Sequence, residues 1–158
     1  SIWQNAEKQA AWAEMVAETV RRFGSHRALA GIVPMDEPNG MDLGFSGAWD
    51  ALAGQIAKVA GDAARRLDVP LIYSPDRWAR AEAARALRQA VGSEAVLALH
   101  HYEPWHYTHQ DETDPVRFDQ SRMAVQGFEA VDGDWAVLEF GAVRHAPDVH
   151  QYLRNRIE

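Results

Sequence analysis

The sequence contains no cysteine, which excludes disulfide bonds, thiol catalysis and zinc sites built on thiolates. It has no run near the roughly 18 uninterrupted apolar residues of a membrane-spanning helix, and its first residues lack the basic and then apolar pattern of a signal peptide. Basic residues number only 16 against 23 acidic ones, and they form no continuous stretch. With a net charge of −7 and no basic patch, we expect neither a nucleic-acid nor a membrane partner.

The 158 residues are 47% hydrophobic and 25% charged, which are ordinary values for one folded domain. Short apolar runs alternate with longer segments in which apolar residues recur at helical spacing. This alternation predicts the α/β class, with a parallel sheet covered by helices. We expect four strands, at 29–35, 69–73, 95–101 and 135–140, and five helices, at 3–23, 46–67, 76–91, from 114 and from 147.

Polar and aromatic side chains stand where each predicted strand ends. Glu37 follows the first strand, Trp78 the second and the segment 100–110 the third, while Glu139 lies at the end of the fourth. The active sites of parallel α/β folds form at the carboxyl ends of the strands. The sequence therefore predicts a site at this edge of the sheet. No glycine-rich phosphate loop follows any of the strands, so nothing supports nucleotide binding.

Glu37 and Glu139 form a candidate catalytic pair. Each is flanked by apolar or aromatic residues, which indicates partial burial. Taken alone, either glutamate is more simply a solvated loop residue. Two carboxyl groups held roughly 5–5.5 Å apart are, however, the arrangement of retaining glycosidases, with one protonated as the acid and the other ionised as the nucleophile.

The tryptophans divide into two groups. Trp78 and Trp105 lie in loops at strand ends, where an indole face can stack on a sugar ring or can equally pack beneath a loop. The others lie on helix faces or within a strand, and we expect them in the core: Trp3, Trp12, Trp49 and Trp135.

A cluster of histidines suggests a metal site as a rival interpretation. Its spacing matches no compact ligand motif, and neighbouring strand residues such as His100 and His101 point to opposite faces. We therefore expect these side chains to make orienting hydrogen bonds, and we expect no metal and no cofactor. The residues concerned are His100, His101, His106 and His109, with Glu103 and Asp111.

Three motifs in order resemble glycoside hydrolase family 5, the cellulase family of retaining (β/α)₈-barrel glycosidases. Asp36-Glu37-Pro38 is similar to the Asn-Glu-Pro of the family's fourth strand. The segment His100-His101-Tyr102-Glu103-Pro104, with Thr108-His109-Gln110 after it, resembles the sixth-strand pattern, and Glu139-Phe140-Gly141 that of the seventh. The resemblance covers the family's third helix to its seventh.

The resemblance implies an endoglucanase-like retaining β-glycosidase that hydrolyses β-linked glycans without a cofactor. It makes Glu37 the acid/base and Glu139 the nucleophile, while Tyr102 positions the nucleophile. The expected substrate-binding residues are Asp36, His100 and Tyr102, with Trp78 and Trp105. Since such substrates lie outside the cell, the resemblance also favours a secreted or periplasmic protein.

The chain departs from the family pattern in two ways. A complete barrel needs eight strands and about 250 residues. We expect one partial barrel over residues 1–158, without the first three strands and the last, active when a second copy or a missing half completes it. Asp36 replaces an asparagine whose amide can donate to the substrate's 2-hydroxyl, so we expect Asp36→Asn to raise kcat/KM on a β-glucan. The alternative is a non-catalytic remnant that binds carbohydrate or serves a structural role.

Overall fold

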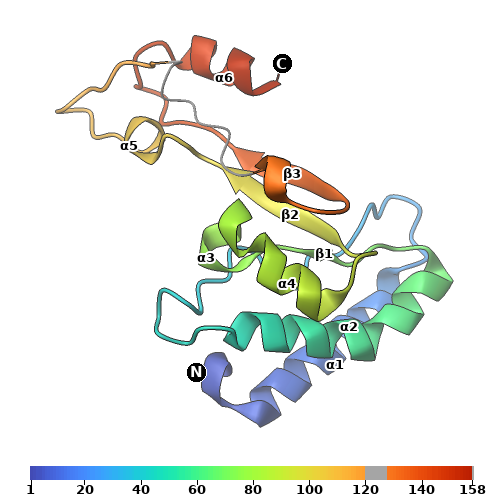
Figure 1. Cartoon of the computed structure of the whole chain (residues 1–158). Coiled ribbons are helices and arrows are strands. Elements are labelled where there is room, and N and C mark those ends of the chain that lie inside the picture. The colour runs from blue at the N-terminus through green and yellow to red at the C-terminus, as the bar shows by residue number, and fades with distance from the viewer. Residues whose placement is uncertain (120–127, 158) are drawn as a thin grey trace.

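The computed structural model describes residues 1–119 and 128–157 (Figure 1). Three parallel strands form a sheet in the order β1-β2-β3. The strands are β1 (Ile72–Tyr73), β2 (Val96–His101) and β3 (Trp135–Phe140). The longer helices are α1 (Ala6–Phe23), α2 (Ala48–Leu67), α4 (Ala84–Val91) and α6 (Val149–Ile157). The short ones are α3 (Asp76–Ala79), α5 (Trp105–Thr108) and the 3₁₀ turns Ile2–Gln4, Ala81–Ala83 and Phe128–Ala130.

The main core lies between α1, α2, α4 and the first two strands. Val20, Trp49, Ile56 and Leu97 are fully buried in it. Burial of each such side chain contributes about 1.5–3 kcal/mol. The Trp49 indole N–H donates to the Ser74 carbonyl over 2.8 Å, which fixes the start of α2 against the end of β1.

The strands at 95–101 and 135–140 are confirmed, but the sheet has three strands rather than the four we expected. The apolar run at 29–35 contributes only one parallel bridge, between Ile32 and Leu71. Pro34 has no N–H to donate to a ladder. Gly31 lies so close to Ile72 that a Cβ at Gly31 would stand 2.6 Å from its Cδ1. The run therefore passes β1 closely without pairing along it.

The helix expected at 76–91 is broken into α3, the 3₁₀ turn at Ala81–Ala83 and α4. Arg77, Trp78 and Ala79 have positive φ angles of 60°, 64° and 59°, the left-handed region. This conformation costs roughly 1–2 kcal/mol per residue, so the surrounding contacts must hold it. A smaller difference is the N-cap of α2, which is Gly47 and not Ser46.

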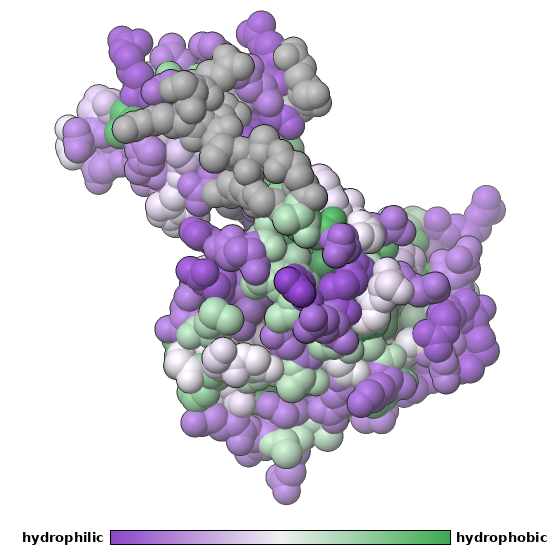
Figure 2. All heavy atoms as spheres, in the orientation of Figure 1, coloured by the Kyte–Doolittle hydropathy of each residue, from purple (hydrophilic) through white to green (hydrophobic). Residues whose placement is uncertain are grey.

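The helix expected from Asp114 is absent from 115–119, which have no regular secondary structure, and its continuation at 120–127 lies outside the described residues. The helix expected from Pro147 is present as α6 and begins two residues later. α6 packs near α5 through a separate cluster built on Tyr107, Ala146 and Tyr152. In Figure 2 this part projects from the larger body, and its coloured atoms on the face in view are mostly hydrophilic.

β3 lies at the edge of the described sheet and exposes apolar side chains. Trp135, Leu138 and Phe140 are 40%, 49% and 41% exposed. The expectation that Trp135 belongs to the core is therefore wrong, whereas Trp49 is fully buried. Among the helices described, none combines the length and apolar character that crossing a membrane requires.

Candidate active site

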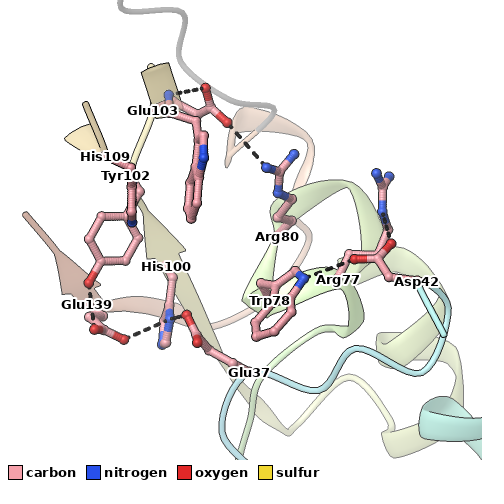
Figure 3. A pocket seen from close by; sticks show the side chains of 11 residues that line it. Glu37, Asp42, Arg77, Trp78, Arg80, His100, Tyr102, Glu103, His109 and Glu139 are labelled. Carbon is pink, nitrogen blue, oxygen red and sulfur yellow. Dashed lines mark hydrogen bonds and ion pairs between the residues drawn. The ribbon is translucent and has the colours of Figure 1, made fainter. Parts of the chain in front are cut away.

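A cavity of about 570 Å³ lies at the carboxyl ends of the strands (Figure 3). The loop before α2, the turn after β1, the end of β2 with the residues after it, and the end of β3 all contribute side chains to its wall. The lining residues are Glu37, Asp42, Arg77, Trp78, Arg80, His100, Tyr102, Glu103, Trp105, His109 and Glu139. The position of the site at this edge of the sheet agrees with the prediction from the sequence.

The His100 imidazole stands at the centre of three carboxyl groups. Its Nδ1 lies 2.9 Å from Oε1 of Glu37 and 3.0 Å from Oε2 of Glu139, as the dashed lines in Figure 3 show. Its Nε2 lies 3.4 Å from Oδ1 of Asp36. The His100 side chain is only 3% exposed, so its orientation is fixed by packing as well as by these contacts.

The shared contact with Nδ1 limits the separation of the two glutamates. Since both oxygens lie within 3.0 Å of one nitrogen, Glu37 Oε1 and Glu139 Oε2 are at most 5.9 Å apart, the two distances laid end to end. Nδ1 can donate a proton to one of them at a time. The pair is therefore bridged by a single ring nitrogen.

An irregularity in the sheet places Glu139 beside His100. Leu99 pairs with Val137, but His100 pairs with Glu139, so the register shifts and Leu138 is left as the extra residue of a β-bulge. Bulges re-aim side chains and are common next to active sites. In a regular ladder His100 would instead lie beside Leu138.

Glu37 lies in a loop that is held by hydrogen bonds to the turn after β1. Its φ of 41° is in the left-handed region, which is costly for a residue with a side chain. The buried carboxylate of Asp76 accepts the backbone N–H of Met41 over 3.1 Å, and the Trp78 N–H donates to the Pro38 carbonyl over 3.0 Å. These bonds hold the 36–42 segment against the turn after β1.

Tyr102 contacts the second glutamate. Its hydroxyl donates to Oε1 of Glu139 over 2.5 Å, so the two Glu139 oxygens contact Tyr102 and His100 respectively. Burial, together with this bond, raises the pKa of Tyr102. The phenol therefore stays protonated and serves as the donor in this bond.

The two strand-end tryptophans lie on the cavity wall with substantial exposure. Trp78 is 47% exposed, and its indole N–H donates to Oδ2 of Asp42 over 3.0 Å. Trp105 is 50% exposed and stacks on His109, with ring centroids 3.4 Å apart and an angle of 13° between the rings. One face of Trp105 is therefore covered by a neighbour, and burial lowers the pKa of that neighbour, His109.

The structure brings together all seven residues that the sequence predicted for the site, with Asp36 at its margin through His100. Asp42, Arg77 and Arg80 also line the cavity, and the sequence analysis did not identify them. The two arginines fall in a segment whose pattern predicts a regular helix, so no signal marked them.

The positions of the histidines bear on the metal site that the sequence suggested as a rival interpretation. Among the described residues, Asp36, His100 and Glu139 each offer a ligand atom, and these atoms lie within 4.8 Å of one another, so they could hold an ion. His101 points away from them, as strand alternation predicts, and packs edge-on against Phe128 with centroids 4.8 Å apart. The broader histidine cluster therefore does not converge on one point.

Comparison with known proteins identifies the fold. No protein-family model matches the sequence, and no curated protein matches it significantly. A solved endoglucanase structure is similar with a TM-score of 0.62 and 17% identity, over 92% of this chain and 52% of its own. The cellulose synthase subunit Z of Clostridioides difficile gives a TM-score of 0.69 and 11% identity, over 92% and 54%. A further glycoside hydrolase gives 0.70 and 9%, over 90% and 48%.

The chain spans about half the length of each of these structures. Identities this low establish the fold and leave the family open, so family 5 membership remains a resemblance. The α/β architecture with its parallel sheet is accordingly similar in fold to about half of each of these structures.

Proposed function

We propose that the site is that of a retaining, endoglucanase-like β-glycosidase that hydrolyses β-linked glycans. The observation that carries the proposal is the separation of Glu37 and Glu139, whose facing oxygens are at most 5.9 Å apart. Retaining enzymes hold their carboxyl groups about 5–5.5 Å apart, whereas inverting enzymes need roughly 6.5–9.5 Å to admit a water. The arrangement favours direct attack by a carboxylate.

In the proposed mechanism, Glu139 attacks the anomeric carbon while Glu37 gives its proton to the leaving oxygen. The glycosidic bond breaks and a covalent glycosyl-enzyme ester forms. Glu37, now ionised, takes a proton from a water that attacks the same carbon and releases Glu139. Tyr102 holds the nucleophile through its 2.5 Å bond, and His100 contacts both carboxyl groups.

The cavity wall supplies the proposed sugar-binding groups. Trp78 and the free face of Trp105 can stack on pyranose rings, while Asp36 and His100 accept or donate hydrogen bonds to hydroxyl groups. We propose that turnover needs a completed barrel, supplied by a second copy or by a missing half. The exposed apolar edge of β3 supports this, since a parallel strand placed there would cover it.

Carbohydrate binding without cleavage is the second candidate function. It is favoured by Trp78 and Trp105, which are 47% and 50% exposed on the cavity wall. In this case the aromatic wall would hold a glycan while the carboxyl groups served as hydrogen-bond acceptors only.

The test compares two substrates in two variants. A soluble β-glucan needs an acid to protonate its leaving group, whereas an aryl β-cellobioside with an activated phenol does not. Glu139→Gln should abolish release from both substrates. Glu37→Gln should abolish glucan cleavage but still give a burst of phenol. Glu94→Gln, an exposed glutamate at the opposite end of β2, is the matched control and should behave as the unaltered chain.

Equal turnover in Glu139→Gln and the unaltered chain would refute the proposed nucleophile. Binding of the glucan with no release from either substrate, at every concentration of chain, would favour the non-catalytic function.

A further inference from the structure

The cavity wall carries an unbalanced set of charges. Two arginines and four acidic residues line it, and Asp36 adds a fifth carboxyl group through its contact with His100. Each of the two arginines is already paired with an acidic residue. Arg77 Nε lies 3.6 Å from Oδ1 of Asp42, and a terminal nitrogen of Arg80 lies 3.7 Å from Oε1 of Glu103.

The excess negative charge therefore lies at the reaction centre. Asp36, Glu37 and Glu139 face a single imidazole, and even a protonated His100 balances only one of them. If Glu37 holds a proton as the acid, two carboxylates still share that one partner. The chain as a whole adds to this potential with its net charge of −7.

Asp36 is the carboxyl group best placed to meet a ligand. Its side chain is 68% exposed, while Glu37 and Glu139 are 34% and 48% exposed and are committed to the proposed chemistry. An ionised carboxylate can only accept hydrogen bonds. A protonated amino group donates up to three and adds a charge of opposite sign, so it suits this position better than a hydroxyl group does.

We propose that the site takes cationic β-glycans, namely oligosaccharides of β-linked amino sugars, with Asp36 as the group that binds the sugar ammonium. The inference rests on the proposed function for the position of the sugar chain. Trp78 and Trp105 stack on an amino sugar as well as on glucose, because the ring face is the same. An anionic glycan would meet the uncompensated carboxylates and is disfavoured.

The test measures binding and hydrolysis separately on the full chain. Binding of a glucosamine hexamer and of cellohexaose is measured by calorimetry, with a chelator present so that no metal ion occupies Asp36, His100 and Glu139. The unaltered chain should bind the glucosamine hexamer more tightly, and the difference should shrink at high salt. Asp36→Asn should weaken glucosamine binding by about threefold to fivefold and leave cellohexaose binding unchanged or tighter.

Asp62→Asn is the matched control. It removes the same charge from an exposed position on α2, so it should leave both affinities unchanged. An equal loss in Asp62→Asn would show that net charge and not Asp36 determines the preference, and it would overturn the proposal. So would equal affinities for the two oligomers in the unaltered chain.

The measurement of hydrolysis distinguishes a failure of the amino-sugar proposal from a failure of the proposed glycosidase. Cleavage of cellohexaose with no preference for glucosamine oligomers, in binding or turnover, would refute the cationic substrate and leave the glycosidase standing. Tight, Asp36-dependent binding of the glucosamine hexamer with no cleavage of either oligomer, at every concentration of chain, would refute a glycosidase completed by a second copy and leave the recognition of amino sugars standing.

Discussion

Tyr102 and Glu139 meet through one hydrogen bond, in which the phenol donates to Oε1 of the carboxylate over 2.5 Å. Tyr102 directly follows β2, and Glu139 is the fifth residue of the neighbouring strand β3. The second Glu139 oxygen is 3.0 Å from His100 in β2, so each oxygen of the proposed nucleophile contacts a residue at the end of β2. Its position thus depends on the pairing of β3 with β2 and on the residue that directly follows β2.

Removal of the Tyr102 hydroxyl should slow the attack by Glu139, the proposed nucleophile, without disturbing the fold. Hydrogen bonds to charged groups are worth about 1.5–3 kcal/mol, so Tyr102→Phe should lower kcat/KM on a β-glucan by about tenfold or more. Tyr73→Phe is the control, since the Tyr73 hydroxyl is buried with no hydrogen-bond partner among the described residues. Equal activity in Tyr102→Phe and the unaltered chain would show that the bond has no catalytic role.

Trp78 should matter for binding more than for bond cleavage. Its exposed indole lies on the cavity wall with its N–H bonded to Asp42, and it takes no part in the contacts of His100 with the two glutamates (Figure 3). Trp78→Ala removes a stacking contact worth about 1 kcal/mol. It should weaken the binding of a cello-oligosaccharide by about fivefold and leave kcat nearly unchanged. Phe23→Ala removes an aromatic ring of similar exposure at the end of α1 and should leave binding unaltered. A fall in kcat alone would contradict this role.

The stability of the chain should fall in acid because of His101. Burial, with a smaller effect of Arg156, lowers the pKa of His101 to about 4. In the unfolded chain this histidine has a pKa of about 6.5, so it binds a proton there more readily than in the folded chain. Its contribution to the free energy of unfolding is therefore fully present above about pH 6.5 and declines as the pH falls to about 4. The expected loss is on the order of 2–3 kcal/mol, measured by denaturant titration at both ends of this range.

His101→Phe tests the cause, because it keeps a ring against Phe128 and removes the titrating group. The variant should lose less stability than the unaltered chain over the same pH range. Identical losses in the two proteins would assign the acid sensitivity to other groups.

A glycine should stabilise the end of α2. Asp68 caps this helix with a φ of 54°, a conformation that glycine adopts without cost. Asp68→Gly should raise the free energy of unfolding by about 0.5–1 kcal/mol, whereas Asp62→Gly, inside the same helix, should lower it by about the same amount. A thermal melt of both variants checks the opposite signs. A fall in stability for Asp68→Gly would mean that its side chain makes a stabilising contact.

Much of the fold could be predicted because its pattern is local. The strands at 95–101 and 135–140 and the first two helices follow from apolar periodicity and from glycines or caps at their ends. The run at 29–35 has the composition of a strand but makes one bridge, since pairing depends on the contact of Gly31 with Ile72. Tertiary contacts of this kind leave no mark on a single segment.

The candidate site could be predicted where its residues belong to a sequence motif, as Glu37, His100 and Glu139 do. The left-handed backbone of Arg77 and Trp78 could not be predicted, because it depends on bonds to a loop some 40 residues earlier, such as that from Trp78 N–H to the Pro38 carbonyl. The sequence marked Trp78 by its residue type and Arg77 not at all.

The break in the ladder between β2 and β3 also has a consequence for what this sheet edge can present. In an unbroken ladder of the same residues, Glu139 would lie beside His101 and point toward Phe128, away from the cavity that His100 faces. The part of β3 before Leu138 and the part after it are thus set independently, the first by the register of the core and the second by the register of the site. One step of register separates a sheet edge that presents a single carboxyl group of the pair to the cavity from one that presents both.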